Sequence, residues 1–451
     1  MALLTSIYAF FAALAALTCG TLFGAWYAWS TGPVSTGFLA RDACNAIFVQ
    51  RRTLAHFLEH DLIRYPEVLR LFSYEVDREG QTVSAFFLPP LASTTAVHRD
   101  GYGCTLIRGE TAPVPPMPEV AQVALPAGDP ARYGFDPDAL SVAFDSVFAE
   151  PLPNHRALLL MVDGKVLGER YAPGFDAEIP KLSFSMHKSI TGLMVAAAAQ
   201  DGLLDVNAPI GLAVWSATDD PRRFLTWKHL LQAQGGFDWQ EEYLTPSADV
   251  PQMNLVARGA GTFAAAKPLA YEPGTHFQYS TGTSNILQLA LREVLENQGV
   301  DYHTYAQTEI FAPIGAASVV QNPDSTGTFI GGSYAYATAR DWAKLGQLLL
   351  QDGVWGDQRI LPRGWRNDAM QPASDSRGRY GYQVWLNKGR RPFFPGVPAG
   401  AFWFSGWQGQ VVLGIPEWNM VFVHLGRTDP AVELQAVNEA LEMLLASRSG
   451  S

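Results

Sequence analysis

The stretch "LSFSMHKSITGLMVAAAAQDGLLDVNAPI", residues 182–210, decides which fold to expect. Its small and apolar residues from Ile190 to Gln200 predict a buried helix. If that helix starts at Ser185, the three-residue spacing places Ser185 and Lys188 on one face. The hydroxyl then lies at the positive end of the helix dipole. This is the only Ser-x-x-Lys in a chain with seven lysines.

The pair has a chemical and a plain interpretation. A serine hydroxyl becomes a good nucleophile when a neighbouring base takes its proton, and a partly desolvated lysine can be that base. Taken alone, the pattern is better explained by a serine that caps a helix and a solvated lysine. Other segments of the sequence must therefore decide between these two interpretations.

Two later segments carry candidate partners. In "PGTHFQYSTGTSNIL", residues 273–287, a Pro-Gly turn precedes Tyr279, and a helix is expected to open near Ser284 or Asn285. A tyrosine at such a corner can relay protons, although a packed aromatic is the simpler interpretation. In "FSGWQGQVVLGIP", residues 404–416, glycines lead into a strand whose amides near Gln410 could bind an oxyanion.

The sheet is expected to come from both ends of the main domain. Two apolar runs between residues 156 and 171 flank Asp163-Gly164, a pair that favours a type I′ hairpin. A second hairpin is predicted over 409–426, followed by a helix over 431–447. Helical patterns dominate between the hairpins, at residues 190–200, 225–232, 285–296 and 341–351. These patterns together predict an antiparallel sheet with a helical insertion, which is an α/β (α+β) fold.

The N-terminus predicts a membrane segment. The first 40 residues contain no Asp, Glu, Lys or Arg, and Ala2 to Trp29 is almost wholly apolar, longer than the roughly 20 residues that cross a bilayer. A basic n-region and a clean small-x-small site before Ser30 are both missing, so an uncleaved anchor is favoured over a signal peptide. Cys19 has no convincing lipobox around it.

The chain divides into four parts. We expect an anchor or signal segment at 1–29, a small cap at 30–110, a Pro/Ala-rich connector at 111–130 and the main domain at 131–451. Cys44 and Cys104 fall within the cap, where a disulfide would suit an exported protein and two buried thiols are the alternative. A net charge of −11 argues against nucleic acid as the main partner.

The order of Ser185-x-x-Lys188, Tyr279 and a Gly-rich C-terminal strand resembles the serine β-lactamase, DD-peptidase and related esterase superfamily. The resemblance runs over most of residues 133–428. Within the superfamily the chain looks closest to the 6-aminohexanoate-dimer hydrolase and carboxylesterase branch. The segments around Cys44 and "GYGCTL" resemble exported members, which favours the disulfide and a catalytic domain on the periplasmic or extracytoplasmic side.

The resemblance implies a role for each residue. Ser185 is the acylated nucleophile, Lys188 its general base or orienting cation, and Tyr279 the proton shuttle. The backbone amides of Ser185 and Gln410 form the oxyanion hole. One such donor typically contributes about 3 kcal/mol to the stabilisation of the transition state. No metal or organic cofactor is implied.

One departure from the family pattern follows the tyrosine. Many relatives carry Tyr-x-Asn, in which the asparagine amide helps to hold the substrate. This chain has Tyr279-Ser280-Thr281, so Asn285 on the next turn is the candidate replacement.

A second departure removes a cation. Where a Lys-Thr-Gly is usual, this chain has Trp407-Gln408-Gly409. A lysine there would bind the carboxylate of a β-lactam or of a peptide terminus. Without that cation we predict small uncharged ester or amide substrates, in a pocket that includes Trp407, Gly409 and Asn285.

Three alternatives remain open. A cell-wall DD-peptidase or β-lactamase shares the fold, although Trp407 argues against it. A membrane-tethered binding protein without turnover is the non-enzymatic alternative. His56-x-x-Glu59-His60 also matches a zinc-peptidase pattern, although such a short pattern arises easily on a polar helix face.

Overall fold

The computed structural model describes residues 31–63, 65–87, 92–149, 154–429 and 431–448, together with Thr18. The predicted membrane segment, including Cys19, therefore lies outside the described residues except at Thr18. Within these described ranges, no helix combines the length and the apolar character needed to span a bilayer.

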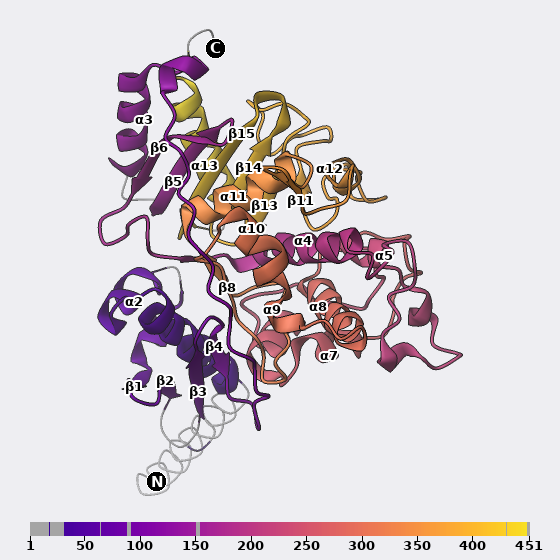
Figure 1. Cartoon of the computed structure of the whole chain (residues 1–451). Helices are drawn as coiled ribbons and strands as arrows, with labels where there is room; N and C mark the ends of the chain where they lie inside the picture. The colour runs from indigo at the N-terminus through magenta and orange to yellow at the C-terminus, as the bar shows by residue number, and fades with distance from the viewer. Residues whose placement is uncertain are drawn as a thin grey trace, which may run out of the picture.

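An antiparallel six-stranded sheet forms the centre of the main domain (Figure 1). Its first hairpin turns at Asp163 and Gly164, which both have positive φ, as a type I′ turn requires. The C-terminal hairpin lies beside it, so the predicted sheet from both ends of the domain is confirmed. The strand order is β12 (Trp385–Leu386), β13 (Phe402–Gly406), β14 (Gln410–Ile415), β15 (Met420–Gly426), β5 (His155–Val162) and β6 (Lys165–Tyr171).

Alternating residues of the strands build two apolar layers. Leu158 and Leu160 of β5 belong to the cluster that includes α3 (Pro137–Ala149) and α13 (Glu433–Leu445). Leu159 and Met161, which point to the other face, join the larger cluster that includes α11 (Ala339–Leu350). Figure 1 shows α3 and α13 packed along the sheet.

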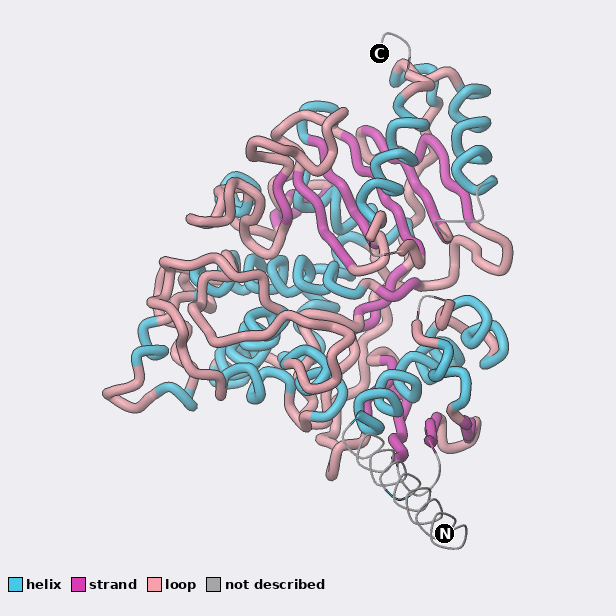
Figure 2. The backbone as a smooth tube through the Cα atoms, turned by 180° about the vertical axis from the view of Figure 1, so that it is seen from behind, coloured by secondary structure: helices cyan, strands magenta, loops and turns pink. Residues whose placement is uncertain are grey.

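The helical insertion adjoins the sheet, with α4 between the two (Figures 1 and 2). Several helices begin at other residues than predicted. For two of them the cause is local: α4 follows a 3-10 turn, and Ser280 Oγ caps α8 by accepting from the Thr283 amide at 3.1 Å. The helices are α4 (His187–Gln200), α5 (Trp227–Leu231), α6 (Asp249–Pro251), α7 (Ala260–Ala265), α8 (Thr281–Asn297), α9 (Tyr302–Ala306), α10 (Ala312–Ile314) and α12 (Trp365–Ala369).

Two small sheets complete the main domain. The first has the order β7 (Lys181–Leu182), β9 (Ala335–Ala337) and β8 (Val320–Gln321). The second is the hairpin of β10 (Val354–Trp355) and β11 (Gln358–Arg359). Because β7 ends shortly before Ser185, the three-stranded sheet helps to position the turn that carries this residue.

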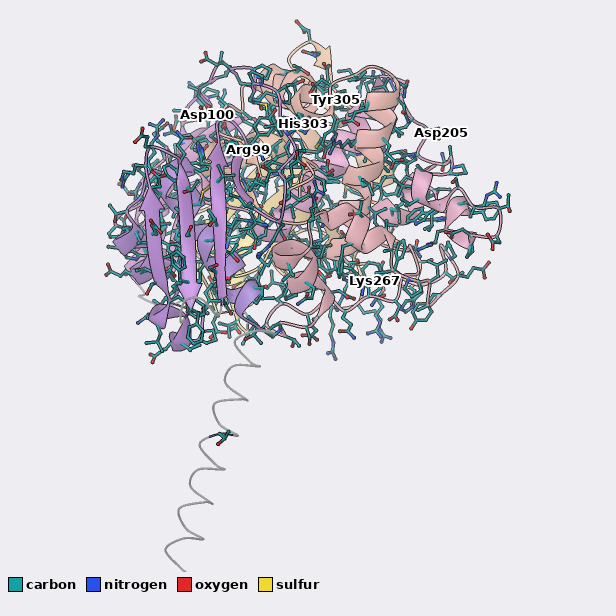
Figure 3. The ribbon with its side chains drawn as sticks, turned by 90° about the horizontal axis from the view of Figure 1, so that it is seen from below. Arg99, Asp100, Asp205, Lys267, His303 and Tyr305 are labelled. Atoms are coloured by element: carbon teal, nitrogen blue, oxygen red, sulfur yellow. A yellow bond between two sulfur atoms is a disulfide. The ribbon has the colours of Figure 1, made fainter. Side chains whose placement is uncertain are left out.

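The cap consists of a helix over residues 31–44, the helix α2 (Leu54–His60) and a four-stranded antiparallel sheet. Figure 3 shows its strands side by side. They are β1 (Ser73–Asp77), β2 (Thr82–Phe87), β3 (Ala92–Arg99) and β4 (Gly103–Leu106). A disulfide joins Cys44 to Cys104, which confirms that prediction.

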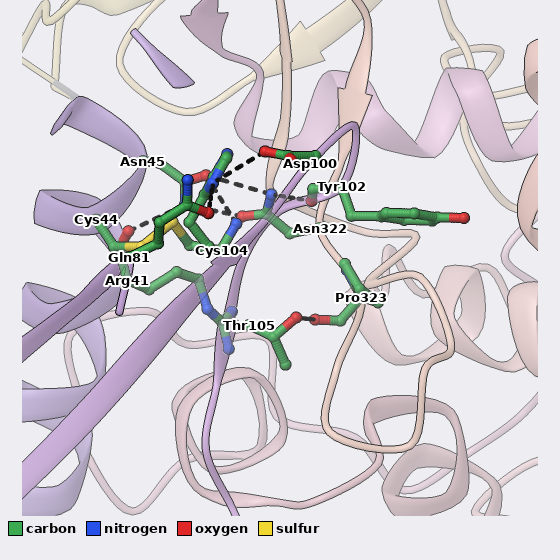
Figure 4. Close-up of a disulfide and its surroundings, with 11 residues drawn as sticks. Arg41, Cys44, Asn45, Gln81, Asp100, Tyr102, Cys104, Thr105, Asn322 and Pro323 are labelled. Atoms are coloured by element: carbon green, nitrogen blue, oxygen red, sulfur yellow. Dashed lines mark hydrogen bonds and ion pairs between the residues drawn. A yellow bond between two sulfur atoms is a disulfide. The ribbon is translucent and has the colours of Figure 1, made fainter. Parts of the chain in front are cut away.

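Buried amides dock the cap on the main domain beside the disulfide (Figure 4). Asn45 Nδ2 donates to Asn322 Oδ1 at 2.9 Å, and Asn322 Nδ2 donates to the Tyr102 carbonyl at 2.9 Å. Both asparagine side chains are fully buried. The chain then runs through residues 107–126 without a helix or strand before it reaches the main domain.

Candidate active site

The nucleophile candidate lies on a tight turn that the sheet holds in place. Ser185 is in the 3-10 turn Phe184–Met186, directly before α4. Phe184 has φ +45, a left-handed conformation that is uncommon for an aromatic residue. Gly406 of β13 lies so close that an added Cβ would be 2.1 Å from the Ser183 carbonyl oxygen. The turn therefore depends on a glycine in the neighbouring strand.

Lys188 is oriented toward Ser185 by two other acceptors. Its Nζ lies 3.0 Å from Ser185 Oγ, 2.9 Å from Thr281 Oγ1 and 3.1 Å from the Gly332 carbonyl oxygen. A neutral amine has two N–H groups and one lone pair. If the N–H groups go to Thr281 and Gly332, the lone pair faces Ser185. This is the arrangement that a general base needs.

Burial brings Lys188 toward the required protonation state. Desolvation lowers the pKa of Lys188 to about 8, while the negative charge of Glu241 acts in the opposite direction. The side chain is buried, so its charged form loses most of its hydration. A substantial neutral fraction is therefore available at mildly alkaline pH.

Glu241 holds Thr281 in place beside Lys188, a role that no sequence motif indicated. Its carboxylate accepts from the Thr281 amide at 2.8 Å, from Thr281 Oγ1, and from Trp239 Nε1 at 2.6 Å. Because the Thr281 hydroxyl donates to Glu241, its oxygen is left to accept from Lys188. In the sequence Glu241 is one of two adjacent glutamates in a loop, and nothing distinguishes it from the other.

Tyr279 completes the group around Ser185. Its hydroxyl hydrogen-bonds with Ser185, and its ring centroid lies 4.9 Å from Lys188 Nζ. The rings of Tyr380 and Trp385 pack around it. Burial raises the pKa of Tyr279 well above its ordinary value. The phenol therefore stays protonated near neutral pH and can donate a proton.

A cavity of about 260 Å³ opens beside Ser185. Trp407 lies in its wall, with the rings of Phe184, Tyr65 and Tyr243 at centroid distances of 5.5, 5.7 and 5.9 Å. None of its described lining residues is Lys, Arg, His, Asp or Glu. The lining comprises Val34, Ser35, Phe38, Tyr65, Pro66, Val68, Leu69, Phe184, Ser185, Tyr243, Leu244, Pro246, Val250, Pro251, Asn254, Leu255, Ser333, Tyr334 and Trp407.

Three of the residues predicted for the oxyanion hole or the substrate pocket do not line this cavity. The Gln410 side chain donates to the Gly426 carbonyl at 2.7 Å, and the residue borders a separate small cavity. Gly409 lies against Thr428 and His424. Asn285 is fully buried and donates to the Thr281 carbonyl at 2.9 Å, so it supports the start of α8. The position that Tyr-x-Asn assigns to asparagine is instead occupied by Thr281.

The zinc-peptidase pattern has no supporting ligand set. His56 and His60 do lie close together, with ring centroids 4.2 Å apart, but His56 Nδ1 accepts from Arg52 Nε at 2.8 Å. Across the described ranges, no three His, Cys, Asp or Glu side chains form a group that could hold a metal ion.

Known sequences match the part of the chain that carries this site. The model of the Beta-lactamase family matches residues 156–446. The 6-aminohexanoate-dimer hydrolase of Paenarthrobacter ureafaciens is 26% identical over 232 residues, which are 48% of this chain and 57% of that protein. The chain thus matches little more than half the length of this curated relative.

Solved structures share the fold. A protein from Bacillus anthracis assigned as a 6-aminohexanoate-dimer hydrolase matches with a TM-score of 0.57 at 20% identity, covering 73% of this chain and 89% of that one. A penicillin-binding-protein homologue from Caulobacter crescentus matches with a TM-score of 0.51 at 16% identity. The match covers 71% of this chain and 100% of that one. EstCE1, a hydrolase with promiscuous acyltransferase activity, matches with a TM-score of 0.53 at 14% identity. The match covers 70% of this chain and 99% of that one.

Proposed function

The chain belongs to the Beta-lactamase family, and from this premise we propose that it is a serine hydrolase of small uncharged esters or amides, acting through an acyl-enzyme on Ser185. The observation that carries the proposal is the orientation of Lys188. Its contacts to Thr281 and Gly332 leave the amine lone pair for the Ser185 hydroxyl.

The proton path follows from these contacts. Neutral Lys188 takes the Ser185 proton while Oγ attacks the substrate carbonyl carbon. Tyr279 donates its proton to the leaving oxygen or nitrogen as the tetrahedral intermediate collapses, and the Lys188 ammonium reprotonates Tyr279. Water then attacks the acyl-enzyme, one of its protons passes through the same pair of residues, and Ser185 regains its hydrogen.

The oxyanion donors are part of the proposal. The amide of Ser185 is one, as expected from the family resemblance. For the second we propose the amide of Trp407 in place of Gln410, because Trp407 lines the cavity with Ser185 and Gln410 does not. A preorganised donor of this kind contributes about 3 kcal/mol to transition-state stabilisation.

The lining of the cavity supports uncharged substrates. A β-lactam or a peptide C-terminus carries a carboxylate, and the described lining offers it no cation. The aromatic rings around Trp407 favour an apolar group instead. We therefore place esters or amides ahead of the DD-peptidase and β-lactamase alternative.

We also propose that the catalytic domain works outside the cytoplasm, held to a membrane by residues 1–29. The Cys44–Cys104 disulfide supports this location, because structural disulfides persist in oxidising compartments. The apolar composition of the N-terminal segment supports the anchor.

The decisive experiment compares the full-length protein with two serine variants on p-nitrophenyl acetate and on a chromogenic β-lactam. Ser185→Ala is expected to abolish ester hydrolysis. Ser189→Ala is the matched control, because Ser189 is buried on the same helix but bonds the Gln383 carbonyl at 2.7 Å. Thermal melting checks that both variants are folded.

Each result has a clear meaning. Ester turnover that Ser185→Ala removes and Ser189→Ala keeps supports the proposal. Equal activity in wild type and Ser185→Ala refutes Ser185 as nucleophile. An inactive wild type on both substrates favours the binding protein, and faster β-lactam than ester turnover favours the β-lactamase alternative.

A further inference from the structure

The cap supplies one wall of the cavity beside Ser185. Val34 and Phe38 come from the helix over residues 31–44, and Tyr65 and Leu69 come from the segment after α2. The family model matches only residues 156–446, so this wall lies outside the matched part of the chain. Its shape is a property of this protein rather than of the family match.

The lining from the cap and the lining from the main domain have the same chemical character. The main domain contributes Leu244, Val250 and Leu255 to the same lining. Val68 of the cap and Leu244 are 50% and 66% exposed, so the apolar lining continues to the surface. Large apolar side chains that line a cavity and reach the surface mark a site for an apolar ligand.

The cap wall is also held firmly. The Cys44–Cys104 disulfide joins the helix over residues 31–44 to β4, and Phe38 packs on Tyr65 at a ring-centroid distance of 4.6 Å. Tyr65 packs in turn on Trp407 of the main domain at 5.7 Å. A preformed wall of this kind requires little ordering when a ligand binds.

We propose that this cavity binds an aliphatic chain of the substrate, and that the cap selects esters by the length of that chain. The proposal rests on the proposed serine hydrolase function and adds the substrate class. The chain can be the acyl group or the alkyl group of the leaving alcohol, since both adjoin the bond that Ser185 attacks. Each methylene that enters the cavity is expected to raise kcat/KM about fourfold.

The test uses two ester series with the full-length protein. The first lengthens the acyl group from p-nitrophenyl acetate through butyrate and hexanoate to octanoate. The second keeps the acetyl group and lengthens the alcohol from ethyl to octyl acetate. We expect kcat/KM to rise steeply with chain length in one series, which identifies the group that the cavity holds. Flat or falling kcat/KM in both series overturns the proposal.

Variants separate the cap wall from general effects. Val68→Asp puts a carboxylate on the exposed part of the lining that the cap supplies, and Leu244→Asp does so on the exposed part that the main domain supplies. If the acyl series is the one that rises, both are expected to reduce the ratio of octanoate to acetate kcat/KM about tenfold, the loss of nearly two buried methylenes. If the alcohol series rises, the same reduction is expected in the ratio of octyl to ethyl acetate. Val142→Asp is the matched control, because Val142 is 64% exposed on α3 and does not line the cavity.

The outcomes also distinguish this inference from the proposed function. If acetate hydrolysis depends on Ser185 but Val68→Asp and Val142→Asp give the same long-to-short ratio, the cap does not select the chain and only this inference fails. If Ser185→Ala leaves acetate hydrolysis intact, the proposed function fails first.

Discussion

Lys188 shows how three neighbours and burial can prepare one side chain for the proton transfer that we propose. Thr281 and Gly332 occupy two hydrogen-bonding directions, so the third points to Ser185. Burial lowers the pKa of Lys188 to about 8. The geometry selects the direction of proton transfer, and the burial makes the neutral amine available.

This pKa predicts the pH dependence of the reaction. Only neutral Lys188 can accept the serine proton, so kcat/KM for an uncharged ester is expected to rise with pH and to reach half its maximum near pH 8. A pH profile on p-nitrophenyl acetate, corrected for spontaneous hydrolysis, checks this. A profile that is flat from about pH 6 to about pH 9 would contradict the role of Lys188 as base.

Glu241 is a positioning residue whose charge should be visible in that profile. Its carboxylate raises the pKa of Lys188 against the effect of burial. Glu241→Gln removes the charge, so the pKa of Lys188 falls and the acidic limb of kcat/KM moves to lower pH. The rate at the plateau is also expected to decrease, because the Thr281 hydroxyl is held less firmly.

The neighbouring glutamate provides the control for this prediction. Glu242 is exposed, and Glu242→Gln removes the same charge from the protein without touching Thr281. Its pH profile should match that of the wild type. If the acidic limb of kcat/KM moves equally in both variants, the net charge of the protein, rather than the contact through Thr281, sets the pH profile.

Among the elements, β13 and the turn before α4 depend on each other. Gly406 lets the strand approach the Ser183 carbonyl so closely that a Cβ would clash at 2.1 Å. Arg427, which directly follows β15, adds a further contact, with its guanidinium 5.0 Å from the Phe184 ring centroid. Ser185, the proposed nucleophile, is thus positioned by a sheet that is remote from it in sequence.

Gly406→Ala is expected to push β13 away from the nucleophile turn. The free energy of unfolding should fall by about 1–3 kcal/mol, the usual cost of overpacking, and ester kcat/KM should fall with it. Gly396→Ala is the matched control, because a Cβ there meets nothing within 4 Å. Denaturant titration and ester assays of both variants check the prediction, and indistinguishable variants would refute it.

At the scale of the whole molecule, one buried carboxylate ties the cap to the main domain. Asp61 lies 2.5 Å from Arg52 Nη2, 2.8 Å from Arg156 Nη1 and 3.0 Å from Arg427 Nη2. Burial opposes its ionisation, but the three guanidinium groups outweigh burial and hold the pKa of Asp61 well below its ordinary value. Arg427 also donates to Gln408 Oε1 at 2.8 Å, beside Trp407.

Asp61→Asn should therefore destabilise the protein by roughly 3–5 kcal/mol, because it removes the anion that three buried guanidinium groups share. Since the pKa of Asp61 is lowered in the folded state, its stabilising contribution is present above the unfolded value of about 4 and is lost as the pH falls further. The difference between variant and wild type should shrink accordingly in strong acid. Thermal melts from about pH 7 to about pH 2 check both points.

Asp219→Asn is the control for this experiment, because Asp219 is exposed. It should leave the melting temperature of the wild type unchanged at neutral pH. If Asp61→Asn melts like Asp219→Asn, the ion cluster is not what holds the cap to the main domain.

Local sequence patterns determined the first hairpin of the sheet and the contact between Ser185 and Lys188. The turn residues Asp163 and Gly164 predict their hairpin, because both positive-φ positions are local requirements. The three-residue spacing likewise predicts that Ser185 and Lys188 meet. They do so across the 3-10 turn and the start of α4, in a short-range contact of 3.0 Å. The family pattern further indicates Tyr279 as the third member of the group.

Tertiary structure alone decided the surroundings of that group. Glu241 reaches Thr281 from a separate loop, and the cap residues Val34 and Phe38 reach the cavity from a segment far before Ser185 in the sequence. The side chain of Gln410 donates to the Gly426 carbonyl, and Gln410 does not line the cavity. Hydrogen-bond partners and cavity walls are set by packing between distant segments, and a local pattern does not specify which distant segment packs where.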